Sequence, residues 1–172
     1  TGVVCSSQKD FTVILSNKAT IVTIDATDWT QQDNTITIQT SGLGSYVYSL
    51  DGIIWQTDPT FEDLTPGHYY VFVKDSNGCG IVTDDIFLLY YPKFFTPNGD
   101  GYNDTWHIEY ATSEPGLITN IFDRYGKLIK QLKYTDTWDG TLNGHLLPST
   151  DYWFVVTRAD GKVYKGHFSL MR

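Results

Sequence analysis

Short runs of β-branched and aromatic residues alternate with turn signals along this chain, and no stretch keeps a capped helical period. Thr35–Gln39 show a period of two, which places Ile36 and Ile38 on a buried face and the threonines outward. Asp51-Gly52 predicts a two-residue hairpin turn. In the first half we predict seven short strands, typical of an immunoglobulin-like sandwich, at residues 11–16, 20–25, 35–40, 46–50, 53–56, 68–75 and 81–89.

The strand pattern continues through the second half. The stretch Tyr152–Val156 is apolar at every position, which is typical of a central strand covered on both sides. The fold class we predict is all-β, with two small β-sandwich (immunoglobulin-like) domains in tandem. In this half the predicted strands are residues 106–110, 117–122, 128–133, 151–158 and 163–171, with turns at 123–126, 138–140 and 159–161.

Composition places a domain boundary after Pro92. The 172 residues are 41% hydrophobic and 15% aromatic, enough for packed cores in one domain or two small ones. Residues 1–92 carry eleven acidic and three basic side chains, a net charge of −8, whereas residues 93–172 carry nine of each. We therefore predict domains at 1–92 and 93–172.

The same numbers exclude some classes of partner. A chain with a pI near 4.7 lacks the clustered cationic face that phosphate binding requires, so we expect no nucleic-acid partner. No apolar run approaches the ~18 residues of a membrane span. Because Thr1 is neither an initiator Met nor the start of a signal peptide, we expect a piece of a longer exported precursor.

Residues 94–106 hold the densest group of turn-forming and oxygen-bearing side chains. Asn98, Asp100 and Asp104 alternate with glycines in this stretch, and their oxygens are ligands that Ca²⁺ prefers on a sharply bent loop. The spacing is not that of an EF-hand, whose last position would fall on His107 instead of Glu. Asx side chains also bond their own backbone without a metal. Calcium binding and a metal-free turn are therefore both open.

Two cysteines, Cys5 and Cys79, lie near the ends of the first half. If they pair, they close a loop of roughly 75 residues, worth on the order of 4 kcal/mol in the chain-entropy model. Export would permit this disulfide. Two free buried thiols are the alternative.

No catalytic motif is present. The four histidines lack metal-binding spacing, and neither a nucleophile elbow nor a cysteine nucleophile motif occurs. We assign no catalysis. Trp138-Asp139-Gly140 has the aromatic and carboxylate groups of a sugar platform, but a Trp that caps the core beside a turn explains it better. The lysines at 127, 130 and 133 are more typical of a solvated face than of a docking patch.

Ordered motifs across about residues 93–172 resemble the gliding-motility-associated C-terminal domain, the type B sorting signal of the type IX secretion system of Bacteroidota. The motifs are Phe95–Trp106, Ile121–Lys127, Trp138–Gly140, Leu147–Phe154 and Gly166–Arg172. The resemblance implies a non-enzymatic sorting domain that is recognised by an outer-membrane component of the secretion apparatus. It also implies a secreted or cell-surface location.

The first half resembles the repeats of large gliding-motility adhesins, through Tyr46–Gly52, Phe61–Tyr69 and Val71–Cys79. Together the two resemblances predict a structural adhesin-type domain followed by a sorting signal, in a monomer. A calcium-dependent carbohydrate-binding module that uses the 94–106 loop and Trp138, with surface glycans as ligands, is the alternative function.

Overall fold

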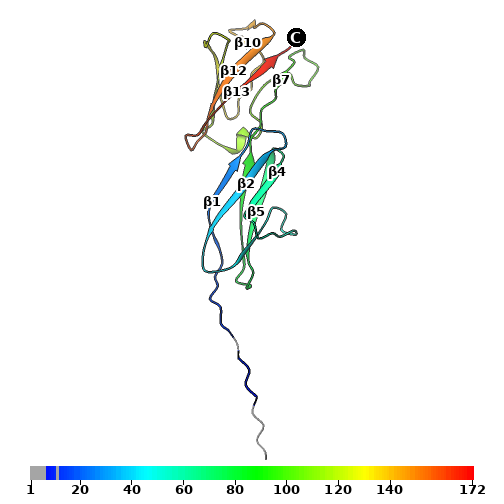
Figure 1. The fold of residues 1–172 in the computed structure, drawn as a ribbon. Helices are drawn as coiled ribbons and strands as arrows, with labels where there is room; N and C mark the ends of the chain where they lie inside the picture. Colours follow the sequence, from blue (N-terminus) through cyan, green and yellow to red (C-terminus); the bar gives the residue numbers. More distant parts are fainter. Residues whose placement is uncertain (1–6, 11) are drawn as a thin grey trace, which may run out of the picture. The chain divides into compact units, whose positions relative to one another are not determined.

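The computed structural model describes residues 7–10 and 12–172 and confirms an all-β protein (Figure 1). Among these residues the one helical element is a 3₁₀ turn, η1 (Ala111–Ser113). Two compact units are present. Of the described residues, the first contains 7–10, 12–24, 38–59 and 70–84, and the second contains 25–37, 60–69 and 85–172. The predicted boundary after Pro92 stays a prediction.

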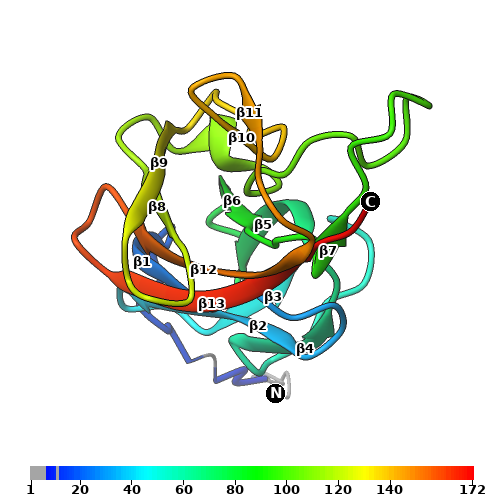
Figure 2. The same ribbon diagram turned by 90° about the horizontal axis from the view of Figure 1, so that it is seen from above.

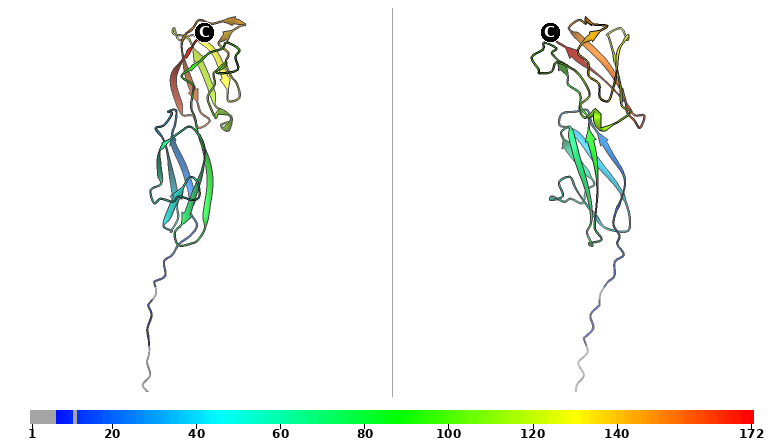
Figure 3. Two further views of the ribbon diagram at one scale, coloured as in Figure 1. Left: turned by 90° about the vertical axis from the view of Figure 1, so that its right-hand side faces the viewer. Right: turned by 180° about the vertical axis from the view of Figure 1, so that it is seen from behind.

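The first six strands form two three-stranded sheets, which lie as two layers (Figure 3). One sheet has the order β1-β2-β4 and the other the order β3-β5-β6. These strands are β1 (Thr20–Thr27), β2 (Asn34–Ser41), β3 (Tyr46–Ser49), β4 (Thr60–Leu64), β5 (Gly67–Asp75) and β6 (Ile81–Leu88).

Strand β2 shows the predicted alternation. Ile36 and Ile38 are buried, and the threonines between and beside them are half-buried. Asn34 is fully buried at the start of the strand, where its side-chain amide donates to the carbonyls of Thr30 and Leu64. The period of two therefore gave the correct buried face.

Three local predictions in the first half are wrong. Residues 53–56 form no strand, and only Gln56 contributes an isolated bridge. Residues 12–16 form no strand, and Phe11 lies outside the described residues. Asp51-Gly52 is not a two-residue hairpin, because the nearest antiparallel pair is Tyr48 with Gln56. The Asp51 carboxylate instead accepts the backbone amides of Ile53 and Ile54, at 2.8 Å each, and closes a wider loop. Strand β4 was not predicted.

The second unit is built on a five-stranded sheet with the order β7-β13-β12-β8-β9. Its neighbours are antiparallel except β7 and β13, which run parallel. A separate two-stranded sheet pairs β10 with β11 (Figure 2). The strands are β7 (Phe94–Phe95), β8 (Ile118–Phe122), β9 (Leu128–Lys133), β10 (Thr141–Leu142), β11 (His145–Leu146), β12 (Thr150–Thr157) and β13 (Val163–Leu170).

One face of this sheet is the wall of an aromatic core. On the central strand β12 the buried side chains are Tyr152, Phe154 and Val156, and the remaining five residues of the strand are at least partly exposed. Irregular segments carry Trp106 and Trp138 onto the same face, where both side chains are buried. The core therefore lies between the sheet and these segments.

The second half was predicted well in its long strands and poorly in its short ones. Strand β9 has the predicted bounds, β8 and β13 differ from prediction by one residue at one end, and β12 by one residue at each end. Residues 106–110 do not form a strand, and contribute isolated bridges from Trp106 to Trp138 and from Glu109 to Tyr90. Two-residue strands such as β7 are too short to show periodicity.

Gly166 on β13 should not tolerate a side chain. A Cβ there would lie 2.7 Å from two ring atoms of Phe154, which is its partner on β12 and is buried. We expect Gly166→Ala to lower the free energy of unfolding by about 1–3 kcal/mol, because the core is overpacked. Urea denaturation measures this, and Lys165→Ala, at an exposed position on the same strand, is the control. An equal effect at both positions would contradict the overpacking.

Candidate functional site

The loop that follows β7 is closed by its own side chains. One oxygen of Asp104 accepts the backbone amides of Asn98 and Gly99, at 2.9 and 2.7 Å, and the other accepts that of Gly101 at 2.8 Å. Asp100 accepts the Tyr102 amide and the side-chain amide of Asn98. These backbone hydrogen bonds lower the pKa of Asp104. The loop therefore has the Asx hydrogen bonds of a turn.

The three predicted calcium ligands, Asn98, Asp100 and Asp104, thus lie in one hydrogen-bonded loop. Among the described residues no group of three or more His, Cys, Asp or Glu side chains is placed to hold a metal. Calcium binding here stays a prediction, and the hydrogen bonds give the alternative of a metal-free turn a definite geometry.

Substitution of Asp104 separates the two interpretations. We expect Asp104→Ala to lower the melting temperature in the presence of chelator, because three backbone amides lose their acceptor. Calcium at about 5 mM would add stability to the wild type by mass action, if the loop binds it with a Kd below that concentration. Asp136→Ala is the control, because it removes a single hydrogen bond, the one that the Lys133 backbone amide donates to the Asp136 carboxylate. An Asp104→Ala variant as stable as wild type in chelator would contradict the turn.

The lowered pKa gives this loop a pH dependence. Because the folded pKa of Asp104 lies below its unfolded value, its stabilising effect is present above the unfolded pKa and is lost as the pH falls through the folded pKa. Two further carboxylates act in the same direction. The pKa of Asp51 is lowered mainly by hydrogen bonds from the amides of Ile53 and Ile54, and that of Asp75 mainly by a hydrogen bond from the Ser16 hydroxyl.

The aromatic side chains of the second unit form one connected cluster. Trp106 stacks on Phe168 with ring centroids 3.9 Å apart, and Trp138 meets Tyr152 edge to face at 5.0 Å. The backbones of the two tryptophans exchange hydrogen bonds of 2.8 and 2.9 Å. Trp138 is 1% exposed, so the prediction that it caps the core is confirmed and it offers no sugar platform.

The glycine of the Trp138-Asp139-Gly140 motif is required by packing. Gly140 has a φ of +79°, and a Cβ on it would collide with a side-chain methyl of Leu170. Arg172 donates hydrogen bonds to the carbonyl oxygens of Gly140 and Leu147. The motif thus holds the end of β13 against the turn.

An ion-pair network that sequence reasoning missed lies elsewhere in the second unit. Arg158 contacts Asp28 and Glu114, each at 2.8 Å. The Asp28 side chain is only 4% exposed. Burial raises the pKa of Asp28, although the positive charge of Arg158 opposes this. Burial by itself would lower the pKa of Arg158. The pKa is raised nevertheless, because Arg158 donates a hydrogen bond to Glu114 and lies close to the negative charges of Asp28 and Glu114. Residues 130 apart in sequence give no local signal of such a pair.

Trp29, next to Asp28, belongs to the aromatic core of the same unit. It is 7% exposed, and its ring stacks on Tyr164 with centroids 4.4 Å apart. Burial and a hydrogen bond with Tyr91 raise the pKa of Tyr164 to about 12. The segment Asp28-Trp29 therefore contributes both an ion pair and a ring to this unit.

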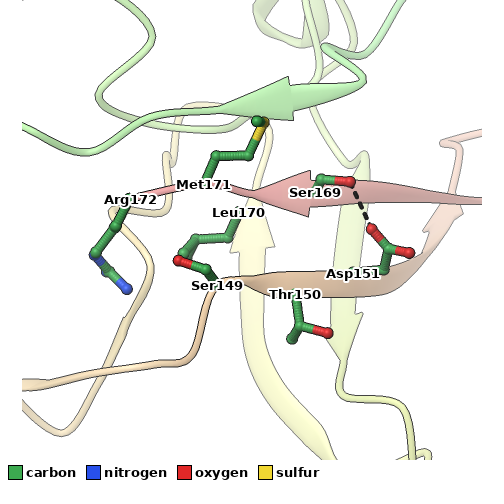
Figure 4. Close-up of a pocket in the computed structure, with 7 residues that line it drawn as sticks. All are labelled: Ser149, Thr150, Asp151, Ser169, Leu170, Met171 and Arg172. Carbon is green, nitrogen blue, oxygen red and sulfur yellow. Dashed lines mark hydrogen bonds between the residues drawn. The ribbon is translucent and has the colours of Figure 1, made fainter.

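An open pocket of about 370 Å³ lies where β12 begins and β13 ends (Figure 4). It is lined by residues 149–151 and 169–172. Ser169 donates a 2.5 Å hydrogen bond to Asp151 across the two strands, and the Arg172 side chain points away from this pair (Figure 4). The hydrogen bond from Ser169 thus goes to a carboxylate and not to a histidine, the usual base of a serine nucleophile.

Residues 89–170 match the model of the CHU_C type IX secretion signal domain. This stretch, just under half of the chain, is similar to that family. It contains the 94–106 loop, Trp106, Trp138, Arg158 and the five-stranded sheet, so the predicted sorting signal is confirmed at the level of the family. The signal domain marks its protein for export across the outer membrane, to the cell surface or the medium.

Comparisons with other proteins gave weaker similarities. Dimeric latent PorU from Porphyromonas gingivalis aligns over 89% of this chain and 20% of its own, with 13% identity and a TM-score of 0.31. The BSP domain of a biofilm-associated protein aligns over 86% and 29%, with 9% identity and a TM-score of 0.34. The 47-kilodalton lipoprotein Tp47 of Treponema pallidum aligns over 90% and 50%, with 12% identity and a TM-score of 0.28. The chain thus spans at most half of each. A search of curated proteins found no match.

The predicted disulfide is not tested. Cys5 lies outside the described residues, and Cys79 is exposed, which disagrees with a buried thiol at that position. The pairing of Cys5 with Cys79 stays a prediction. No helix in the part of the chain that the structure describes is long and apolar enough to cross a membrane.

Proposed function

We propose that residues 93–172 are a non-enzymatic sorting signal that directs a longer cargo through the type IX secretion system, and that the preceding residues are a structural adhesin-type domain. The observation that carries the proposal is the match of residues 89–170 to the secretion signal family. The support for a structural role of the preceding residues is their two-layered sandwich and their resemblance to adhesin repeats.

The partner we propose is an outer-membrane component of the secretion apparatus, met by a monomer of this chain. A signal domain acts by being bound, so its exposed surface and not an internal cavity is the working part. No nucleic acid is involved in this proposal, in agreement with the formal net charge of −8.

A calcium-dependent carbohydrate-binding module receives no support from the geometry of its proposed parts. Trp138 is buried, and the oxygens of Asp104 already accept three backbone amides. A glycan array probed with and without chelator tests this alternative directly, and calcium-dependent retention on a glycan would revive it.

Secretion of reporter fusions tests the proposed function. We expect a reporter fused ahead of residues 1–172 to leave a host with a type IX system, and a reporter fused to residues 1–92 to stay inside. The full fusion should also be retained in a host that lacks the system. Equal export of both fusions, or export without the system, would overturn the assignment.

A further inference from the structure

The outer face of the five-stranded sheet carries exposed apolar side chains near its centre. On β12 the outward residues include Trp153, which is 43% exposed, and Val155, which is half-buried. An antiparallel sheet with one solvated face normally alternates apolar and polar residues. The apolar run at 152–156 predicts a cover on both sides, whereas Trp153 is 43% exposed among the described residues.

The register of the strands joins these residues into a row. Trp153 pairs with His167 on β13 and with Phe122 on β8, and Phe122 pairs with Leu128 on β9. Cross-strand partners have Cβ atoms about 4.5–5.5 Å apart, so the four side chains form one stripe across four adjacent strands. Leu128 is 50% exposed. We call His167, Trp153, Phe122 and Leu128 the outer row.

Polar side chains on either side of the outer row bond to one another. Ser169 donates to Asp151 at 2.5 Å on one side (Figure 4), and Gln131 donates to Asn120 at 2.9 Å on the other. These pairs satisfy their own hydrogen bonds across neighbouring strands. The outer row is therefore an apolar centre with a polar rim, the arrangement found in protein interfaces.

The charge of the sheet differs from that of the chain. Its five strands carry three lysines, one histidine and one aspartate, although the whole chain has a formal net charge of −8. Lys130 and Lys133 lie on the edge strand β9, where lysines also prevent unwanted strand pairing. Lys165 lies on β13 two residues from His167, so its side chain is on the same face of the sheet as the outer row.

We propose that the outer row is the surface to which a protein of the secretion apparatus binds. This partner places apolar side chains on Trp153 and carboxylates near Lys165. This inference rests on the proposed function and specifies its binding surface. The exposed tryptophan supplies the anchor, since aromatic residues in the centre of an interface carry much of the binding energy. The lysine supplies electrostatic complementarity, which selects an acidic partner.

Export of full-chain variants tests the proposal. We expect Trp153→Thr and Lys165→Glu, in the 1–172 fusion, each to reduce export by roughly tenfold or more, because truncating an interface anchor or reversing a complementary charge costs at least a decade in affinity. Tyr102→Thr, at a residue that is 78% exposed on the 96–104 loop, and Lys127→Glu, in the turn before β9, are the matched controls and should export like wild type. Melting temperatures of the purified variants verify that each remains folded.

A site-specific photo-crosslinker identifies what covers the row. With the crosslinker at position 153 of the full chain, we expect an adduct with a protein of the secretion apparatus, and none from position 102. Adducts with a second copy of the chain or with a glycan would overturn the proposal. So would wild-type export of the folded Trp153→Thr, Lys165→Glu double variant. Failure of the wild-type fusion itself to leave the cell would refute the proposed function instead.

Discussion

Truncation of Phe168 to alanine should lower the free energy of unfolding of the second unit by about 4 kcal/mol. Phe168 is fully buried on β13 and stacks on Trp106 at 3.9 Å. Its ring also lies within 6.3 Å, between centroids, of Tyr152 and of Phe95. An alanine there would leave a cavity among rigid rings that collapse poorly, so both the lost transfer energy and the cavity contribute.

Urea denaturation followed by tryptophan fluorescence measures this loss, because Trp29, Trp106 and Trp138 all belong to the same core. Phe94→Ala is the matched control: the residue type is the same, and Phe94 on the neighbouring strand β7 is 49% exposed. We expect the control to cost less than about 1 kcal/mol. Similar losses at both positions would show that the rings around Phe168 do not form the packed core described here.

Replacement of Arg158 by methionine should destabilise the second unit by about 3 kcal/mol at neutral pH. The loss comes from what the variant leaves behind. Asp28, whose side chain is 4% exposed, would lose its cationic partner and would keep the 3.3 Å hydrogen bond from the Leu89 amide. Breaking a buried pair by removing one partner is costly because the remaining charge stays desolvated.

The destabilisation should shrink as the pH falls. Burial already raises the folded pKa of Asp28 above its unfolded value, and loss of Arg158 would raise it further. A carboxyl group whose pKa is raised by folding destabilises the folded state when it is ionised. This destabilisation is greatest above the folded pKa and disappears below the unfolded pKa, where the group is protonated in both states. The difference between wild type and Arg158→Met should therefore be large at pH 7 and smaller near pH 4. A difference independent of pH would rule out Asp28 as its cause.

Lys162→Met provides the control for loss of a positive charge nearby. Lys162 pairs with Asp160 at 3.3 Å, but their side chains are 69% and 50% exposed. Solvent screens such a pair, so we expect a change below about 1 kcal/mol. The contrast tests whether burial, and not charge alone, gives Arg158 its effect.

Several features of the candidate site were present in the sequence as local signals. The density of Asn, Asp and Gly in residues 96–104 predicted a tight loop, and Asp104 holds it through three backbone amides. Whether these residues bind a cation was not predictable, because Asn and Asp oxygens can accept backbone hydrogen bonds in a turn or coordinate a cation. The cross-strand neighbours of Trp153 were likewise hidden, since register joins residues that are tens of positions apart.

The sequence by itself determined the all-β class, the long strands β8, β9, β12 and β13, and the family of residues 89–170. Each depends on periodicity or on ordered motifs, which are local properties of the chain. Only the tertiary structure decided that Asp28 pairs with Arg158, that Trp29 stacks on Tyr164, and that Trp153 and Leu128 lie in one row. Pairing and burial depend on which distant segments meet, and no local pattern encodes that choice.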